Sequence, residues 1–104
     1  MKYQHPSMTE KQLQSAVVQL AELLGYSVYH TYDSRRSQPG FPDLVLCRPP
    51  RLLFVELKTT KGKLTAEQKA WGERLIDSGA EYRIARPSHW NAGAINVALG
   101  RRGR

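Results

Sequence analysis

A chain of 104 residues is long enough for one hydrophobic core and too short for two, so we expect a single domain over residues 1–104. Its apolar runs fall short of the roughly 20 residues that span a bilayer, and residues 1–11 lack the apolar segment of a signal peptide. The only cysteine, Cys47, excludes an internal disulfide and is expected to be a small buried side chain, and no Cys/His spacing suits zinc. These features favour a cytoplasmic protein with no membrane partner and no small-molecule cofactor.

Sixteen Lys and Arg residues against nine Asp and Glu give a formal net charge of +7. An excess of basic charge can serve solubility alone. It also suits a polyanionic partner whose phosphate groups supply most of the affinity.

The start of the first helix carries a capping signal. Ser7 or Thr9 can cap the helix, with Glu10 or Gln12 completing a capping box, and residues 1–8 are expected to form a loose arm. In chain order we expect a helix from about residue 10 to 24, followed by strands at 26–31, 43–48 and 52–58. Thr65 is expected to cap a helix over 66–78, and a strand over 81–85 follows. Ser88 is expected to cap a short helix over 88–99, and residues 100–104 form a basic, frayed tail.

These elements predict an α/β fold with a mixed central β-sheet flanked by helices, in the order αβββαβ. Residues 52–58 are apolar on both faces, which is typical of a strand covered on both sides. Pro49 and Pro50 force a tight connection to the strand before it, so the two strands are expected to form a hairpin.

Three charged residues interrupt this apolar pattern. Asp43 opens one strand of the predicted hairpin, and Glu56 and Lys58 close the other. Because side chains alternate along a strand, Glu56 and Lys58 share a face, about 6.5–7 Å apart along it. The antiparallel pairing then brings Asp43 beside them at one edge of the sheet.

Such a cluster predicts a metal site. Two neighbouring carboxylates repel each other unless a cation joins them, and Mg²⁺ or Mn²⁺ prefers hard oxygen ligands. Lys58 would then lie beside the attacking water or the phosphate. The alternative is a surface ion pair between Glu56 and Lys58, with Asp43 as a turn former.

Pro42-Asp43 followed by Glu56-Leu57-Lys58 matches the PD-(D/E)xK nuclease motif. The longer stretch HTYDSRRSQPGFPDLVLCRPPRLLFVELKTTKGKLTAEQKAW resembles the VRR-NUC branch of that superfamily, and the similarity covers a core of about residues 9–87. The resemblance implies a restriction-endonuclease-like fold and Mg²⁺ as cofactor, with Mn²⁺ able to substitute.

The resemblance also implies roles for individual residues. Asp43 and Glu56 correspond to the metal-binding carboxylates, the backbone carbonyl of Leu57 to a further ligand, and Lys58 to the catalytic lysine. Gln68 corresponds to the glutamine of the second helix, and the pattern places it on the stripe that faces the sheet; a solvated glutamine is the alternative.

The first helix contributes two further candidates by the same resemblance. Glu10 corresponds to the acid of the first helix, in both the catalytic and the metal site, although it could equally serve the helix dipole. Gln14 is a weaker, supporting candidate.

Basic residues flank these acids on two loops. We interpret them as phosphate contacts that position DNA, although a solvated surface is the plainer interpretation. They are Arg35, Arg36, Lys61 and Lys63. His30, Tyr32 and Asp33 belong to the family-like stretch but receive no role, and Trp71 and Trp90 are expected in the core or an interface.

Together these features predict a metal-dependent, structure-selective DNA endonuclease, acting on branched DNA such as Holliday junctions. Symmetric cutting of two strands needs two sites, so we expect a homodimer. By analogy, its small size suggests a phage or mobile-element origin. The alternatives are a monomeric nuclease for flaps, nicks or single strands, a non-catalytic basic DNA-binding module, and an enzyme that processes RNA.

Overall fold

The structure of the chain, a computed structural model, describes residues 8–31 and 38–101. Its four strands form one mixed sheet in the order β1-β2-β3-β4, in which β1, β2 and β3 pair antiparallel and β3 and β4 pair parallel. The α/β class with a mixed central sheet flanked by helices is therefore confirmed. The elements are α1 (Glu10–Leu23), β1 (Ser27–His30), β2 (Leu44–Arg48), β3 (Arg51–Leu57), α2 (Ala66–Asp77), β4 (Glu81–Ala85), α3 (Pro87–Asn91) and α4 (Ala94–Gly100).

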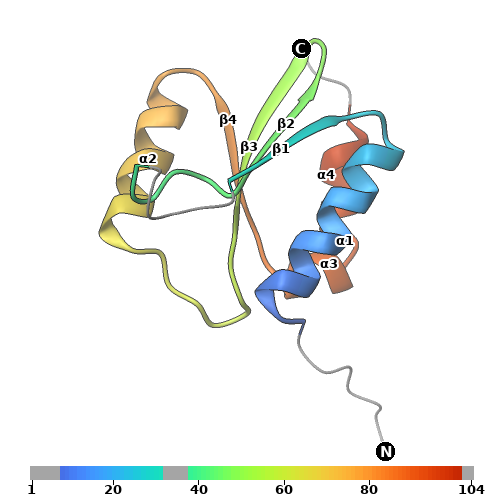
Figure 1. The fold of residues 1–104 in the computed structure, drawn as a ribbon, viewed down its shortest axis with the longest axis horizontal. Coiled ribbons are helices and arrows are strands. Elements are labelled where there is room, and N and C mark those ends of the chain that lie inside the picture. The colour runs from blue at the N-terminus through green and yellow to red at the C-terminus, as the bar shows by residue number, and fades with distance from the viewer. Residues whose placement is uncertain (1–7, 32–37, 102–104) are drawn as a thin grey trace, which may run out of the picture.

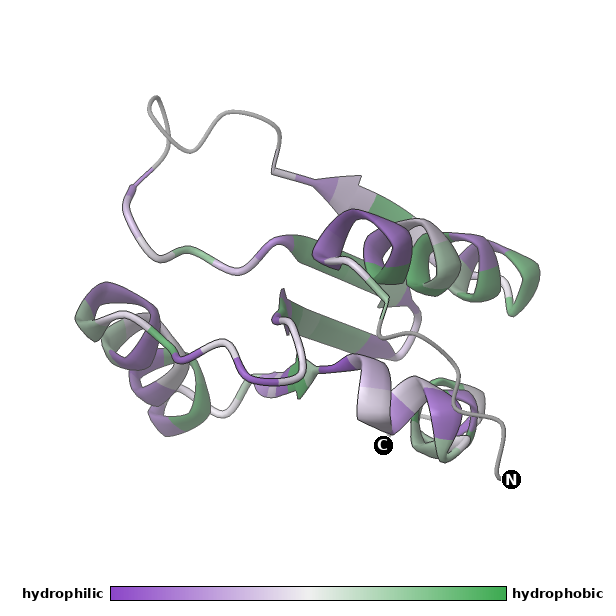
Figure 2. Cartoon of the chain, turned by 90° about the horizontal axis from the view of Figure 1, so that it is seen from below, coloured by the Kyte–Doolittle hydropathy of each residue, from purple (hydrophilic) through white to green (hydrophobic). Residues whose placement is uncertain are grey.

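The helices lie in two layers about the sheet. Helices α1, α3 and α4 cover one face, and α2 lies alone on the other (Figure 1). The two central strands, β2 and β3, are apolar along most of their length, whereas the helices carry both apolar and polar stripes (Figure 2). This pattern is what a sheet buried between amphipathic helices requires. In the described part of the chain, none of the helices combines the length and apolarity of a membrane span.

Helix α1 begins at the capping box that the sequence predicts. The hydroxyl of Thr9 accepts a hydrogen bond from the Gln12 amide at 3.1 Å, and the Gln12 side chain accepts one from the Thr9 amide at 2.9 Å. From there Leu13, Val17 and Ala21 point into the core, because they lie at helical spacing on one face.

The β2–β3 hairpin turns through two residues, Pro49 and Pro50, as expected. Its register pairs Leu44 with Val55, and the alternation sends Leu53, Val55 and Leu57 into the core. The opposite face of β3 carries Phe54 and Glu56 toward α2.

The prediction that Cys47 is buried is wrong. Its side chain is half-buried, because it points away from the main core and lies opposite Leu52, which is 48% exposed. Trp71 and Trp90 are also half-buried; Trp90 packs against the core, and Trp71 packs on Phe41.

Helix α2 packs against β4 through a glycine. A Cβ atom at Gly72 would lie 2.9 Å from the ring of Tyr82, so only a hydrogen atom fits there. This close approach brings the first turn of α2 within reach of β3.

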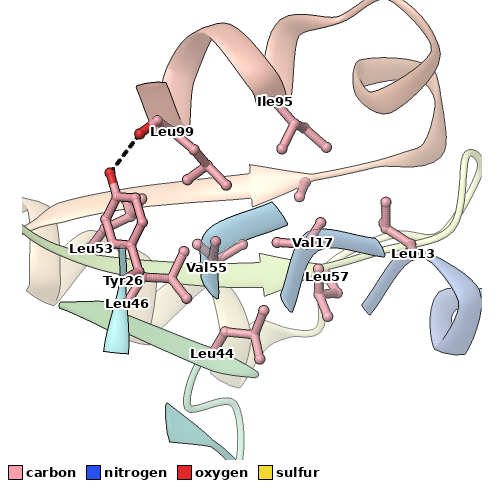
Figure 3. Packing of buried hydrophobic residues seen from close by; sticks show 12 residues of the cluster. Leu13, Val17, Tyr26, Leu44, Leu46, Leu53, Val55, Leu57, Ile95 and Leu99 are labelled. Atoms are coloured by element: carbon pink, nitrogen blue, oxygen red, sulfur yellow. Dashed lines mark hydrogen bonds between the residues drawn. The ribbon is translucent and has the colours of Figure 1, made fainter. Parts of the chain in front are cut away.

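The C-terminal segment differs from the single helix expected over residues 88–99. Gly93 adopts φ +76°, a conformation that L-residues disfavour, and it separates α3 from α4. The cap of α3 is Arg86, with Pro87 at the first helical position, and not Ser88. Helix α4 adds Ile95 and Leu99 to the hydrophobic core (Figure 3).

A buried arginine joins α4 to the sheet. Arg51, only 6% exposed, donates through Nε and Nη2 to both carboxylate oxygens of Glu81, and through Nη1 to Tyr26 Oη and the Ala98 carbonyl. Tyr26 Oη in turn donates to the Leu99 carbonyl at 2.8 Å (Figure 3).

The tail expected to be frayed is anchored at its start. The carbonyl of Arg101 accepts hydrogen bonds from Arg48 and Arg51, at 2.6 and 3.2 Å. Residues 102–104 lie outside the described residues.

The ion pair between Arg51 and Glu81 predicts a pH dependence of stability. Hydrogen bonding to Arg51 lowers the pKa of Glu81 from 4.5 to about 2. The stabilisation is therefore fully present above pH 4.5 and is lost as the pH falls from 4.5 toward 2. Glu81→Gln should lower the free energy of unfolding by ~2–3 kcal/mol at pH 7, because it leaves a buried guanidinium poorly paired.

Urea unfolding at pH 7 and pH 3 measures this effect, with Glu22→Gln on the exposed face of α1 as the control. The difference between wild type and Glu81→Gln should shrink at pH 3. Equal destabilisation at both pH values would contradict the assigned role of the ion pair.

Candidate functional site

Asp43 is placed at the edge of the sheet by backbone hydrogen bonds on both sides. Its Oδ2 accepts a hydrogen bond from the amide of Leu57 at 2.8 Å, and its carbonyl accepts one from the amide of Thr31 at 3.0 Å. The side chain thus reaches across from β2 to the end of β3. The hairpin register that the sequence predicts is what makes this contact possible.

Glu56 lies beside Asp43 and is almost inaccessible to solvent, with 2% of its surface exposed. Burial first, and then the neighbouring Asp43 carboxylate, raise the pKa of Glu56 from 4.5 to about 8. A buried carboxyl group beside another is stable when it holds a proton or when a cation neutralises the pair.

Lys58 follows on the same side of β3 and is half-buried. Its amide donates to the carbonyl of Ala85 at 3.0 Å, which extends the β3–β4 ladder by one residue. Its positive charge acts to lower the pKa of Glu56 and of Glu10, so it lies close to both acids. The structure thus brings Asp43, Glu56 and Lys58 together.

Glu10, the first residue of α1, lies on the open side of this cluster. Its side chain is exposed, yet partial burial and the charge of Asp43 raise its pKa, while Lys58 opposes the shift. The first turn of α1 and the loop that follows β3 lie at the same end of the molecule (Figure 1). The structure therefore places Glu10 near the acids, at the rim instead of the centre.

Gln68 connects α2 to the buried acid through both ends of its side-chain amide. Its Oε1 accepts a hydrogen bond from the amide of Thr65 at 2.8 Å and so completes a capping box. Its Nε2 donates to Oε2 of Glu56 at 3.0 Å. The helix cap therefore fixes the orientation of the amide that faces Glu56.

Gly40 allows the loop before β2 to pack directly on the start of α2. It adopts φ +86°, and a Cβ atom there would clash with the carbonyl carbon of Glu67 and lie 2.6 Å from the amide of Gln68. Next to it, the Phe41 ring packs edge-on against Phe54 at 6.0 Å and against Trp71 at 5.1 Å. These contacts hold α2 at the distance from which Gln68 reaches Glu56.

The oxygen donors suit a hard divalent cation better than a soft one. Two carboxyl groups, Asp43 and Glu56, lie together, but no three side chains among His, Cys, Asp and Glu within residues 8–31 and 38–101 form a group that could hold a metal ion. The assignment of Glu10 and of the Leu57 carbonyl as further ligands stays a prediction.

The other predicted residues within the described part of the chain have no described contact with Asp43 or Glu56. Lys61 and Lys63 are exposed on the loop after β3, as phosphate contacts would be, and Gln14 lies in a shallow surface hollow with His30. Arg35, Arg36, Tyr32 and Asp33 lie outside the described residues.

Two residues that contribute to the surroundings of the site were not predicted from the sequence. Tyr82 lies on the face of β4 that adjoins Phe54, and burial, then the charges of Glu56 and Asp43, raise its pKa to about 12. Arg86, at the end of β4, donates two hydrogen bonds to the loop that follows β3. Alternation along β4 could have indicated both, but only once the parallel register with β3 was known.

Comparison with known proteins gives one consistent result. Residues 2–89 match the family model described as "VRR-NUC domain". A solved structure described as "VRR_NUC domain protein" is 20% identical with a TM-score of 0.68, and covers 91% of this chain and 93% of its own. Another, described as "VRR_NUC domain", is 26% identical with a TM-score of 0.66. Its similarity covers 82% of this chain and 92% of its own. No curated protein sequence matches significantly.

The close approach at Gly40 predicts a strong effect of a single methyl group. Gly40→Ala should destabilise the protein by ~2–4 kcal/mol, because it combines backbone strain with a steric clash against α2. Gly79→Ala is the matched control, since Gly79 has φ +87° and a Cβ atom there would have nothing within 4 Å. Thermal unfolding of both variants distinguishes the two contributions, because Gly79→Ala introduces backbone strain alone and Gly40→Ala adds the steric clash with α2. Equal losses of stability would show that the contact with α2 has no effect.

The raised pKa of Glu56 predicts that its charge costs stability. The cost is absent below pH 4.5 and grows as the pH rises toward 8, because the unfolded chain releases this proton more readily than the folded one. In EDTA, Glu56→Gln should raise the free energy of unfolding by roughly 2–4 kcal/mol at pH 8 and by much less at pH 4.5. Urea unfolding measures this, with Glu73→Gln on α2 as the control. A destabilised Glu56→Gln variant at pH 8 would contradict it.

Proposed function

The chain belongs to the VRR-NUC domain family, a family with a nuclease-type fold, and we propose that it is a metal-dependent endonuclease that hydrolyses phosphodiester bonds in branched DNA. One observation carries this proposal. A buried carboxyl group, Glu56, adjoins a second acid, Asp43, and a lysine, Lys58, at the end of β3 from which a basic loop continues.

Asp43 and Glu56 would hold a divalent cation, Mg²⁺ or Mn²⁺, with the Leu57 carbonyl and Glu10 as further candidate ligands. Such a cation supplies Lewis-acid polarisation of the phosphate and lowers the pKa of water. The protein's part is to keep the two acids close together in a partly desolvated place. The Leu57 amide does this for Asp43, and Gln68 does it for Glu56.

Lys58 is the residue that contacts the reacting groups in this scheme. Its ammonium group would orient the attacking water or neutralise charge that builds on the phosphate. Gln68 would keep the Glu56 carboxylate in one orientation through the transition state.

The basic loop supports DNA as substrate. Lys61 and Lys63 are exposed on the loop that follows β3, where they would contact phosphates without reading bases. Because such phosphate contacts carry no base information, we propose that the domain recognises DNA shape. Paired incisions across a four-way junction need two sites, and we propose a homodimer that acts in the cytoplasm.

Cleavage assays with purified protein test the activity. With Mg²⁺ or Mn²⁺ the wild type should cut branched DNA, and EDTA should abolish the cut. Asp43→Asn and Lys58→Met should each lower the single-turnover rate by about 100-fold or more, while DNA affinity changes only a few-fold. Lys69→Met, an exposed lysine on α2, is the matched control. A wild-type protein that binds DNA but does not cleave it would contradict the proposed nuclease activity and support the alternative of a non-catalytic DNA-binding module.

The choice of substrate and the oligomeric state are tested together. A panel of four-way junctions, flaps, nicked duplex, linear duplex, single strands and RNA should show the fastest cleavage on the junction. Light scattering should give twice the 11.8 kDa mass of one chain. A monomer that prefers flaps or nicks would support the alternative nuclease, and a preference for RNA would overturn the DNA assignment.

A further inference from the structure

Arg86 stands one residue beyond β4, on the side of the sheet that carries the acids. The parallel register pairs Glu56 with Ile84 and Leu57 with Ala85, and the Lys58 amide continues the ladder. Since side chains alternate along a strand, Arg86 emerges on the same face as Ile84 and Glu56. It is half-buried there, next to the loop that leaves β3.

The guanidinium of Arg86 is bound to the backbone of that loop. Its Nη1 donates to the carbonyl of Thr59 and to the carbonyl of Gly62, both at 2.7 Å. The same turn is closed by a longer bond from the Gly62 amide to the Thr59 carbonyl, at 3.3 Å. Charge-assisted hydrogen bonds of this length are the stronger kind, so Arg86 supplies the firmest contacts described for this turn.

The turn is also tight, which limits the positions it can take. A Cβ atom at Gly62 would lie 2.7 Å from the Thr59 hydroxyl and 3.6 Å from Cδ of Lys58. The side chain of Lys58 therefore runs along the turn that Arg86 holds. A movement of the turn would move Lys58 with respect to Glu56.

The loop needs such an anchor because its own charges repel one another. Lys58, Lys61 and Lys63 lie within six residues of sequence, and like charges at this spacing favour an open chain. Arg86 adds a further positive charge, but two backbone carbonyls converge on it. The guanidinium of Arg86 therefore binds the loop through the backbone carbonyls of Thr59 and Gly62, and not through the lysine side chains.

Arg86 itself is fixed by α3. Its amide donates to Nδ1 of His89 at 3.2 Å, and its carbonyl accepts from the amide of His89 at 2.9 Å. Pro87, next to it, is buried. These bonds fix the backbone of Arg86. A chain of contacts therefore connects α3, through Arg86, to the Thr59–Gly62 turn.

We propose that Arg86 is a positioning residue that holds the Thr59–Gly62 turn, and thereby sets where Lys58, Lys61 and Lys63 meet the bound DNA. The proposal rests on the nuclease function proposed above for its catalytic consequence. Its structural part, the holding of the turn, is independent of that function. Arg86 is not placed in contact with substrate.

Two variants and one matched control test the proposal. Arg86→Met keeps the apolar stem and removes the donors, and Arg86→Lys restores donors to the same position. Arg83→Met removes the same charge three residues earlier, in β4, where Arg83 pairs with Glu81 and not with the loop. The first measurement is cleavage after Lys61 and Lys63 by a lysine-specific protease, well below the melting temperature of each variant.

We expect protease cleavage in the turn to rise about tenfold or more in Arg86→Met, to fall back in Arg86→Lys, and to stay unchanged in Arg83→Met. The single-turnover rate of DNA cleavage should fall by about 10- to 100-fold in Arg86→Met and recover in part in Arg86→Lys. DNA affinity should fall by only a few-fold in Arg86→Met, because Lys61 and Lys63 keep their charges and lose only their fixed position.

The outcomes separate this proposal from the nuclease function. Unchanged protease cleavage in a folded Arg86→Met variant overturns the proposal, and so does a loosened turn with an unchanged DNA cleavage rate. If Arg86→Met fails to fold, Arg86→Lys must still show intermediate protease sensitivity, or the proposal is wrong. A wild-type protein without any nuclease activity refutes the function, while the protease result alone still decides whether Arg86 holds the turn.

Discussion

The structure depends on one constraint, the closeness of two carboxyl groups at the open end of the largely apolar β2–β3 hairpin. Asp43 accepts a hydrogen bond from the amide of Leu57, and Glu56 accepts one from Gln68, and these bonds stabilise the two side chains in their close positions. Burial makes their repulsion stronger than it would be in water. The fold therefore maintains a place that favours a proton or a cation.

The stabilisation that offsets this cost comes from the same strand. The core face of β3 carries Leu53, Val55 and Leu57, each nearly inaccessible to solvent, while Glu56 lies on the opposite face. Burial of apolar side chains contributes about 1.5–3 kcal/mol for each residue of this size, enough to accommodate one unfavourable acid. The structure thus combines core and site in a single strand. Helix α2 supports the site through the side chain of Gln68, and Arg86, next to α3, holds the loop after β3.

Much of this arrangement could be predicted from the sequence because it follows from local rules. Alternation in β3 and the two-proline turn predict the hairpin, and the hairpin places Asp43 opposite Glu56. The resemblance adds Gln68, which periodicity alone leaves undecided. The role of Arg86 could not be predicted, because it depends on the parallel register of β3 and β4, which is formed by residues far apart in the chain. The break at Gly93 was missed because a single glycine does not always end a helix.

The central claim is that Asp43 and Glu56 form a pair that requires a cation when both are ionised. Carboxyl-carbon NMR of Glu56, followed from pH 4 to pH 10 with and without Mg²⁺, measures this most directly. Without Mg²⁺, Glu56 should titrate near pH 8, far above 4.5, and Mg²⁺ should lower its pKa, since a bound cation favours the charged form. A Glu56 that titrates near 4.5 without the ion, or that does not respond to Mg²⁺ or Mn²⁺, would contradict the account.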